Sequence, residues 1–292
     1  TSKDDGSFSF AKAPYGTWII REIESPKGYV LSEEEIAVTI GKVDEVVEIE
    51  LVNYFIKGNI ALTKVDEDYP DNKLSGAVFE VYSDTNGDGK LDKDDTLLGE
   101  MKELDGGVYQ MSELRYGKYL VKETKAPTGF VLDENVYSVS VEENGKTYTV
   151  ENKAGVGFIN AAQKGSLKIV KTSSDGKVEG FSFRVTGVDY DKTFKTDKNG
   201  EIVIEGLRIG DYTVSEVSDK ASAGYILPAD KQVTVKVDAT AIVQMHNEFR
   251  DTPKTGDDFN LGLWVSLAAL SVVGAGVLGF VGYKNRKKKK ED

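Results

Sequence analysis

The sequence predicts an all-β protein in which tandem β-sandwiches precede one C-terminal transmembrane helix. Thirty glycines and fourteen tyrosines accompany many short runs of Val, Ile and Thr bounded by turn residues, which is typical of strands. One segment recurs three times along the chain, and residues 259–283 carry no charge. A repeated unit followed by a single apolar span indicates a row of small domains attached to a membrane.

The repeated segment places a glycine turn before an alternating strand, a glutamate, and a loop that ends in glycine, an aromatic residue, an aliphatic residue and leucine. Its copies are YGTWIIREIESPKGYVL (15–31), YGKYLVKETKAPTGFVL (116–132) and IGDYTVSEVSDKASAGYIL (209–227). A second segment, KGNIALTKVD (57–66), recurs as KGSLKIVKTS (164–173). It opens units of about 100 residues, a size that suits a small β-sandwich.

These repeats divide the chain in order. We expect residues 1–56 to be the back half of a domain, because they hold the glutamate segment without the opening strand. Two complete domains are expected at 57–161 and 164–250. The remaining parts are a linker at 251–258, the apolar span at 259–283 and a basic tail at 284–292. The chain starts at Thr1 without a signal peptide, so we expect it to be the C-terminal part of a longer secreted protein.

A polar residue ends each apolar row that should face a core. Because side chains alternate along a strand, every second residue shares a face. The rows are Ile60, Leu62, Lys64 and Leu167, Ile169, Lys171 in the opening strands; Trp18, Ile20, Glu22, then Tyr119, Val121, Glu123, then Tyr212, Val214, Glu216 in the repeated segment; and Val47, Ile49, Leu51, Asn53 and Val243, Met245, Asn247 in the last strands. An unpaired buried charge is costly, so the simplest interpretation is a hydrogen-bonded ion pair.

The order of opening strand, glutamate segment and last strand resembles the Cna B-type, SpaA-like domains of Gram-positive adhesins and pilins. The resemblance covers essentially all of residues 1–250. It implies immunoglobulin-like, prealbumin-like β-sandwiches in which a lysine and an asparagine form an intramolecular isopeptide bond, promoted by the glutamate. For residues 164–250 it implies a bond between Lys171 and Asn247, with Glu216 as the promoting residue.

In residues 57–161 the lysine would be Lys64 and the glutamate Glu123, but two asparagines compete. Asn160 precedes Lys171 by eleven positions, just as Asn53 precedes Lys64 by eleven. Asn152 lies 29 residues after its glutamate, near the 31 that separate the pair in the other copies. We favour Asn160 and keep Asn152 as the alternative. Residues 1–56 retain Glu22 and an asparagine without the opening lysine, so no bond is expected there.

Burial would supply the chemistry of such a bond. Desolvation favours a neutral lysine and a protonated glutamate. The neutral amine is a competent nucleophile, and the protonated carboxyl can stabilise the oxyanion and pass protons to departing ammonia.

The C-terminal part predicts the location of the protein. The uncharged span is long enough to cross a bilayer, and KNRKKKK after it indicates a cytoplasmic end. The pentapeptide directly before it is Thr252, Pro253, Lys254, Thr255 and Gly256. This order resembles the sortase sorting signal of wall-anchored proteins, with Thr252 where the LPXTG pattern has leucine. The resemblance implies that a sortase cuts after Thr255 and joins it to peptidoglycan; a permanent membrane anchor is the alternative.

The segment DTNGDGKLDKDD (84–95) matches a twelve-residue calcium loop. Gly89 would supply its turn, and the flanks are strand-like. The candidate Ca²⁺ ligands are the side chains of Asp84, Asn86, Asp88, Asp92 and Asp95 and the backbone carbonyl of Lys90. The alternative is an acidic turn that closes a hairpin. No cofactor is otherwise required.

Composition narrows the function. A net charge of −12 argues against nucleic-acid binding. The absence of cysteine and the single histidine, His246, argue against thiolate sites, multi-histidine metal sites and a Ser-His-Asp triad. We expect a non-enzymatic stalk of a wall-anchored adhesin whose upstream domains bind a host or neighbouring-cell ligand. The alternatives are the anchor of a wall-attached enzyme and a pilin subunit.

Overall fold

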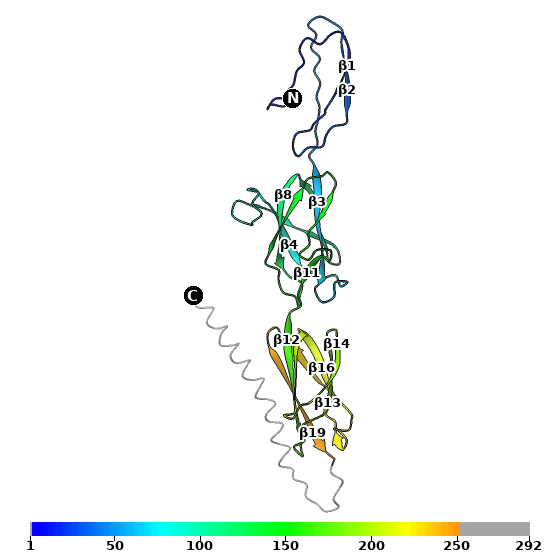
Figure 1. The fold of residues 1–292 in the computed structure, drawn as a ribbon, viewed down its shortest axis with the longest axis vertical. Helices are drawn as coiled ribbons and strands as arrows, with labels where there is room; N and C mark the ends of the chain where they lie inside the picture. The colour runs from blue at the N-terminus through cyan, green and yellow to red at the C-terminus, as the bar shows by residue number, and fades with distance from the viewer. Residues whose placement is uncertain (1, 251–292) are drawn as a thin grey trace, which may run out of the picture.

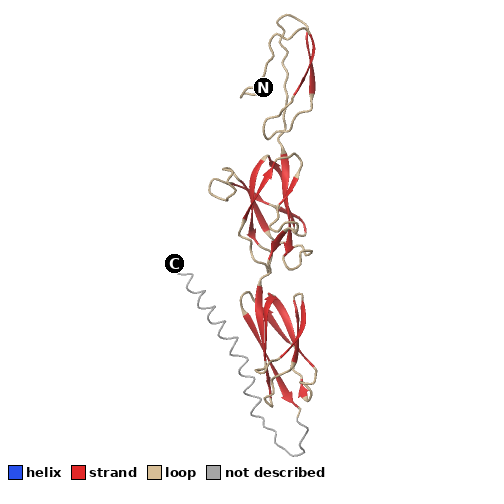
Figure 2. Ribbon diagram, viewed as in Figure 1, coloured by secondary structure: helices blue, strands red, loops and turns tan. Residues whose placement is uncertain are grey.

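The computed structural model describes residues 2–250, which contain strands and loops but no helix (Figure 2). They form three β units, which follow one another along the long axis of the molecule (Figure 1). The units comprise residues up to 56, residues 57–161 and residues 164–250, and are called the first, second and third unit. No helix within residues 2–250 could span a bilayer. The pentapeptide 252–256, the apolar span 259–283 predicted to cross a membrane and the basic tail lie outside the described residues.

The first unit is an antiparallel pair of strands, β1 (Gly16–Arg21) and β2 (Glu35–Ile40). The expected last strand over 47–53 is not formed, and Trp18 is 43% exposed. A two-stranded ribbon has no second sheet to cover its apolar face, so the inward row expected from alternation is only partly buried here.

The second unit consists of two sheets packed face to face. Its strands are β3 (Lys57–Asp66), β4 (Val78–Ser83), β5 (Thr96–Glu100), β6 (Lys102–Asp105), β7 (Val108–Arg115), β8 (Gly117–Lys125), β9 (Val136–Val141), β10 (Thr147–Thr149) and β11 (Phe158–Asn160). One sheet has the order β10-β3-β7-β6, with β11 also paired to β3, and the other has the order β5-β4-β8-β9. The core between them includes Ile60, Leu62, Phe79 and Phe158.

The third unit repeats this plan. Its strands are β12 (Lys164–Ser173), β13 (Ser182–Gly187), β14 (Tyr190–Lys195), β15 (Glu201–Arg208), β16 (Gly210–Val217), β17 (Tyr225–Ile226), β18 (Lys231–Val235) and β19 (Thr240–Phe249). The sheets have the orders β15-β12-β19-β17 and β14-β13-β16-β18. The core is separate from that of the second unit and includes Leu167, Phe181, Phe183 and Met245.

In both complete units the opening strand lies parallel to the last strand. Lys171 of β12 pairs with Met245 of β19, two residues before Asn247. Lys64 of β3 pairs with Phe158 of β11, two residues before Asn160. The predicted inward rows of these strands are confirmed, since Ile60, Leu62, Lys64 and Leu167, Ile169, Lys171 are buried; in β3 the buried row continues to Asp66.

The glycine at the second position of each opening strand allows a close backbone approach. A Cβ on Gly58 would lie 2.8 Å from the Lys146 carbonyl oxygen, and one on Gly165 would lie 2.2 Å from that of Lys236. Any larger residue would push the opening strand away from the loop beside it, which explains the repeated Lys-Gly step.

Candidate functional site

Lys64, Glu123 and Asn160 meet between the two sheets of the second unit. The lysine and the asparagine come from the paired strands β3 and β11, whereas the glutamate comes from β8 in the opposite sheet. Their exposed fractions are 0%, 0% and 3%, respectively. Two sheets thus enclose three polar groups in an apolar core, and we call this set the second-unit triad.

The Glu123 carboxylate contacts both other members of this triad. Its Oε1 lies 3.7 Å from Lys64 Nζ, and Asn160 Nδ2 donates to Oε1 at 3.0 Å and to Oε2 at 2.9 Å. The Asp133 backbone N–H also donates to Oε2, at 2.9 Å. Lys64 Nζ donates to the Phe158 carbonyl at 3.1 Å and lies 4.9 Å from the centre of that ring.

Burial moves both ionisable groups toward their neutral forms. Desolvation lowers the pKa of Lys64 to about 8, although the Glu123 charge opposes this shift. Desolvation also raises the pKa of Glu123, against the hydrogen bonds from Asp133 and Asn160. Burial therefore favours a neutral amine beside a protonated carboxyl.

The Asn160 carboxamide has an unused oxygen. Its Oδ1 is buried without a hydrogen-bond partner, whereas its NH₂ group faces the carboxylate. Once Glu123 is protonated, a half-turn of the amide presents Oδ1 to the acid proton and satisfies that oxygen. The same turn polarises Cγ, the atom that a neutral Lys64 amine would attack.

Asn152 makes different contacts. Its Nδ2 donates to Asp133 Oδ2 at 2.8 Å and to the Ile159 carbonyl at 2.9 Å, and its Oδ1 accepts the Ile159 N–H at 2.6 Å. These bonds use its polar atoms to hold the loop that precedes β11. The structure brings Asn160, not Asn152, against Glu123.

The third unit contains the equivalent triad of Lys171, Glu216 and Asn247. Asn247 Nδ2 donates to Glu216 Oε1 at 2.6 Å. Lys171 Nζ donates to the Thr172 carbonyl at 2.6 Å and lies 4.2 Å from the centre of the Phe181 ring. Burial lowers the pKa of the lysine and raises that of the glutamate. One oxygen each of the glutamate and the asparagine is buried without a partner.

The first unit holds two of the three groups. Glu22 Oε2 accepts the Asn53 Nδ2–H at 2.6 Å and the Ser32 backbone N–H at 2.8 Å. In the second unit, the backbone N–H of Asp133, also ten residues after its glutamate, donates to Glu123 Oε2 at 2.9 Å. In both units the loop that follows the glutamate therefore supplies a backbone hydrogen bond to the carboxylate.

Sequence reasoning missed the aromatic rings and backbone groups that surround each amine. Phe158, Phe181 and Tyr225 lie within 4.2–6.0 Å of a triad lysine, measured from Nζ to the ring centre. One of these rings could have been found from the sequence: Tyr225 is the aromatic residue that follows glycine at the end of the repeated loop.

The loop 84–95 turns its carboxylates onto its own backbone. Asp84 Oδ2 accepts the Gly89 N–H at 3.1 Å, and Asp95 accepts the Thr85 and Asp92 N–H groups at 3.1 and 2.9 Å. Throughout residues 2–250, no three His, Asp or Glu side chains gather where they could hold one metal ion. The predicted calcium ligands are thus near one another in a turned loop but are not assembled. Asp84 is nevertheless 6% exposed, and its Oδ1 has no partner.

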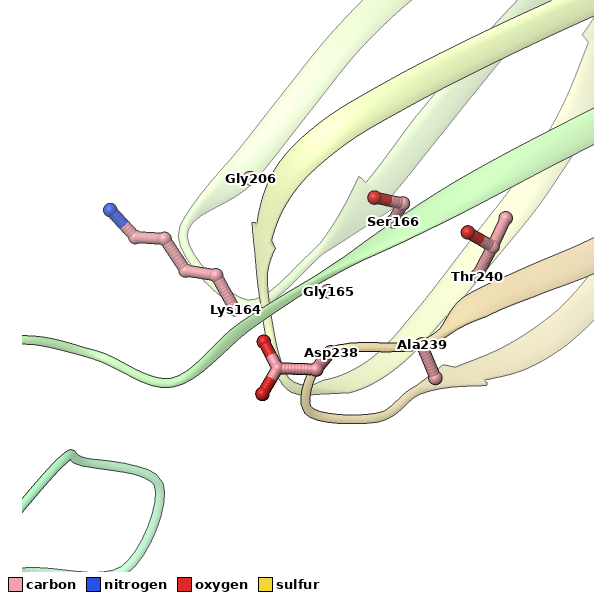
Figure 3. A pocket seen from close by; sticks show the side chains of 7 residues that line it. All are labelled: Lys164, Gly165, Ser166, Gly206, Asp238, Ala239 and Thr240. Atoms are coloured by element: carbon pink, nitrogen blue, oxygen red, sulfur yellow. The ribbon is translucent and has the colours of Figure 1, made fainter.

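A shallow hollow of about 320 Å³ lies at one end of the third unit, where the Lys164 side chain extends away from it (Figure 3). It is lined by Lys164, Gly165, Ser166, Gly206, Asp238, Ala239 and Thr240. These are mostly small residues and none belongs to a triad. The candidate chemistry lies in the two cores and not in this hollow.

Comparison with known families gives one match. The sequence profile of SpaA, described as a prealbumin-like fold domain, matches residues 1–54, 58–154 and 165–249. Among curated proteins, no sequence matches this chain.

Several solved structures are similar. The Bacillus anthracis TIE protein is 26% identical, with a TM-score of 0.65, over 85% of this chain and 44% of that one. The chain therefore spans less than half of that protein. The pilus adhesin SpaC from Lactobacillus rhamnosus GG is 14% identical, with a TM-score of 0.41, over 68% of this chain and 32% of that one. The minor pilin GBS52 of Streptococcus agalactiae is 18% identical, with a TM-score of 0.31, over 69% of this chain and 100% of that one.

Proposed function

Because the chain belongs to the SpaA family of prealbumin-like fold domains, we propose that it is the stalk of a cell-surface adhesin. Intramolecular Lys–Asn isopeptide bonds stiffen the stalk, and a sortase attaches it to peptidoglycan. The observation that carries this proposal is the recurrence of one Lys–Glu–Asn triad in two successive units, with the lysine and the asparagine buried in both and the glutamate buried in the second unit and partly buried in the third. A hydrogen-bonded ion pair uses only the NH₂ group of each asparagine and leaves its buried Oδ1 without a partner, whereas amide formation uses the lysine, the glutamate and the asparagine together.

The proposed reaction converts two side chains into one amide and ammonia. The neutral Lys64 amine attacks Asn160 Cγ while protonated Glu123 donates to Oδ1 and stabilises the oxyanion. Glu123 then takes a proton from the attacking nitrogen and delivers one to Nδ2. The Cγ–Nδ2 bond breaks, ammonia leaves and the Nζ–Cγ amide remains. The product carries no charge, so the desolvation penalty on the lysine disappears.

The strand order explains how such a bond would stiffen a stalk. The chain enters the third unit at β12 and leaves it at β19, which lie side by side in parallel. A bond between Lys171 and Asn247 would carry a pulling force directly from one strand to the other. Residues 172–246 would then bear no load, and the sheets would not unzip.

Wall attachment gives a testable result at the C-terminus. We predict that a sortase cuts between Thr255 and Gly256, so protein released from cell walls by muralytic enzymes should end at Thr255 and carry a peptidoglycan fragment. C-terminal peptide mass spectrometry measures this. A Thr255→Ala variant should stay in the membrane fraction, whereas a Lys254→Ala variant should behave as the wild type. Mature surface protein with residues 259–283 intact would show a permanent membrane anchor instead. Within residues 2–250 no observation favours an enzyme anchor.

Calcium binding by the loop 84–95 is a second proposal, and Asp84 is the observation that favours it. A carboxylate oxygen that is buried without a partner, next to a glycine turn, is suited to a cation ligand. Binding would require Asp88, Asp92 and Asp95 to release their backbone bonds and turn inward. We predict weak to moderate calcium affinity through about six oxygens.

Calorimetry on residues 57–161 with millimolar calcium measures this affinity. Asp84→Ala combined with Asp88→Ala should abolish the binding heat. Asp94→Ala removes one charge from the same loop at a position without a ligand role, so it should retain most of the affinity. Absence of heat in the wild type would leave the hairpin turn as the role of this loop.

A further inference from the structure

The three units are connected by two joints of the same construction. Each joint consists of the residues between an asparagine and the next opening strand, together with the glutamate loop before it and the turn after it. Two backbone hydrogen bonds tie the departing chain to its own glutamate loop at each joint. They are Val30 N to Tyr54 O (2.8 Å) and Ile56 N to Gly28 O (2.9 Å) at the first joint, and Val131 N to Ala161 O (2.9 Å) and Gln163 N to Gly129 O (2.8 Å) at the second.

One residue in each joint also binds the following unit. The carbonyl of Ile56 accepts the Tyr116 N–H at 3.0 Å, and the carbonyl of Gln163 accepts the Ile209 N–H at 3.1 Å. The N–H of this one residue therefore donates to the preceding unit, and its carbonyl accepts a hydrogen bond from the following unit. Between Asn160 and β12, only residues 161–163 separate the two units, and two of them are held by backbone bonds. The connection has little slack, unlike a flexible linker.

A partly buried arginine adds a side-chain contact at the second joint. Arg208 comes from the end of β15 in the third unit, and its side chain is 14% exposed. It donates to both oxygens of Asp66, at 2.6 and 2.8 Å, and to Asp68 at 3.0 Å, both in the second unit. Its guanidinium also lies 4.8 Å from the centre of the Tyr69 ring. Lys164 adds a contact of 3.3 Å to Asp68.

This ion pair differs from a surface salt bridge. The Asp66 side chain is only 3% exposed, and the two-pronged geometry matches the planar fork of a guanidinium to a carboxylate. Burial opposes ionisation of Asp66, but its hydrogen bonds from Arg208 outweigh this, and the pKa of Asp66 is lowered. Such a contact can hold two bodies in one orientation, because any rotation about the joint would separate both hydrogen bonds.

The first joint places an arginine at the same point with a different partner. Arg115 precedes Tyr116 as Arg208 precedes Ile209, and its guanidinium lies 3.9 Å from the centre of the Phe55 ring. The backbone carbonyls of both arginines accept a tyrosine hydroxyl, from Tyr119 at 2.6 Å or Tyr212 at 2.8 Å. The tyrosine anchors the turn that carries each arginine.

We propose that Arg208 is a locking residue that fixes the angle between the second and third units, so that these two units behave as one rigid body. The biological role of this rigidity rests on the proposed stalk function, but the rigidity itself can be measured whether or not the protein is a stalk. Domains joined by a small interface usually move relative to one another, so a fixed angle would be a distinct property of this joint.

Spin-label distance measurements on residues 57–250 test the proposal, because each unit has its own closed core and the chain contains no cysteine. Labels on Lys102→Cys and Thr193→Cys place one exposed site in each unit. The unmodified joint should give one narrow distance distribution. Arg208→Ala and Asp66→Asn should each widen it by about two-fold or more, since interdomain motion is the default without a strong interface.

The matched control is Arg184→Ala, which removes a two-pronged arginine pair to Asp191 inside the third unit. It should leave the distribution as narrow as before, and circular dichroism should show that all variants remain folded. A broad wild-type distribution, or a narrow one in Arg208→Ala, would overturn the lock. If the wild-type distance distribution is narrow and Arg208→Ala widens it, the lock is supported even when the sortase test fails. In that case only the proposed wall attachment is overturned.

Discussion

The fragment 57–250 is expected to weigh two ammonia molecules less than its sequence mass. Each triad would lose one ammonia as its lysine amine replaces the asparagine Nδ2. Intact-mass spectrometry under denaturing conditions measures the loss, and the absence of cysteine removes disulfides as an explanation of any covalent change. The effect is all or none for each unit, because an amide either forms or does not.

Single variants assign each loss to its residues. Lys64→Ala, Glu123→Ala and Asn160→Ala should each restore one ammonia, and the glutamate variant does so with both would-be partners present. Asn152→Ala is the matched control, since that residue binds Asp133 and the Ile159 backbone instead of Glu123. It should leave both losses in place. An unmodified mass in the wild type would return Glu123 to an ordinary buried ion pair.

The second large effect is on the stability of the third unit. A covalent link between Lys171 and Asn247 closes a long loop, and its removal should lower the free energy of unfolding by about 4 kcal/mol. For a unit of this size, that corresponds to a fall in Tm of roughly 15–30 °C. Glu216→Ala should show this fall, measured by calorimetry on residues 57–250, and a Lys171→Ala variant should show at least as much.

Lys168→Ala is the control for this experiment. Lys168 lies on the same strand and pairs with Glu201 on the partly exposed face, at 2.7 Å. Surface pairs of this kind contribute about 0–1 kcal/mol, so its Tm should change little. A Glu216→Ala variant as stable as this control would contradict a stabilising covalent bond that depends on Glu216.

Strand faces were predictable from the sequence, because alternation is a local property of the backbone. The period of two placed Lys64, Glu123, Lys171 and Asn247 on inward faces, and burial confirms these positions. The three copies of the glutamate segment also indicated the number of units, since a repeat is visible without any knowledge of contacts.

The same rule failed for the first unit. Trp18 and Val47 have the correct parity for a core but are exposed, at 43% and 40%. Alternation states which residues share a face, whereas burial depends on whether a second sheet covers that face.

What the sequence alone determined is therefore the set of polar residues that end the apolar rows, and the units in which they recur. The tertiary structure decided that Asn160 and not Asn152 contacts Glu123, because β11 and not β10 reaches the lysine end of β3. It also decided that Arg208 meets Asp66 across the second joint. Both are contacts between segments distant in sequence, and their geometry depends on sheet order and on the angle between units, which no local pattern encodes.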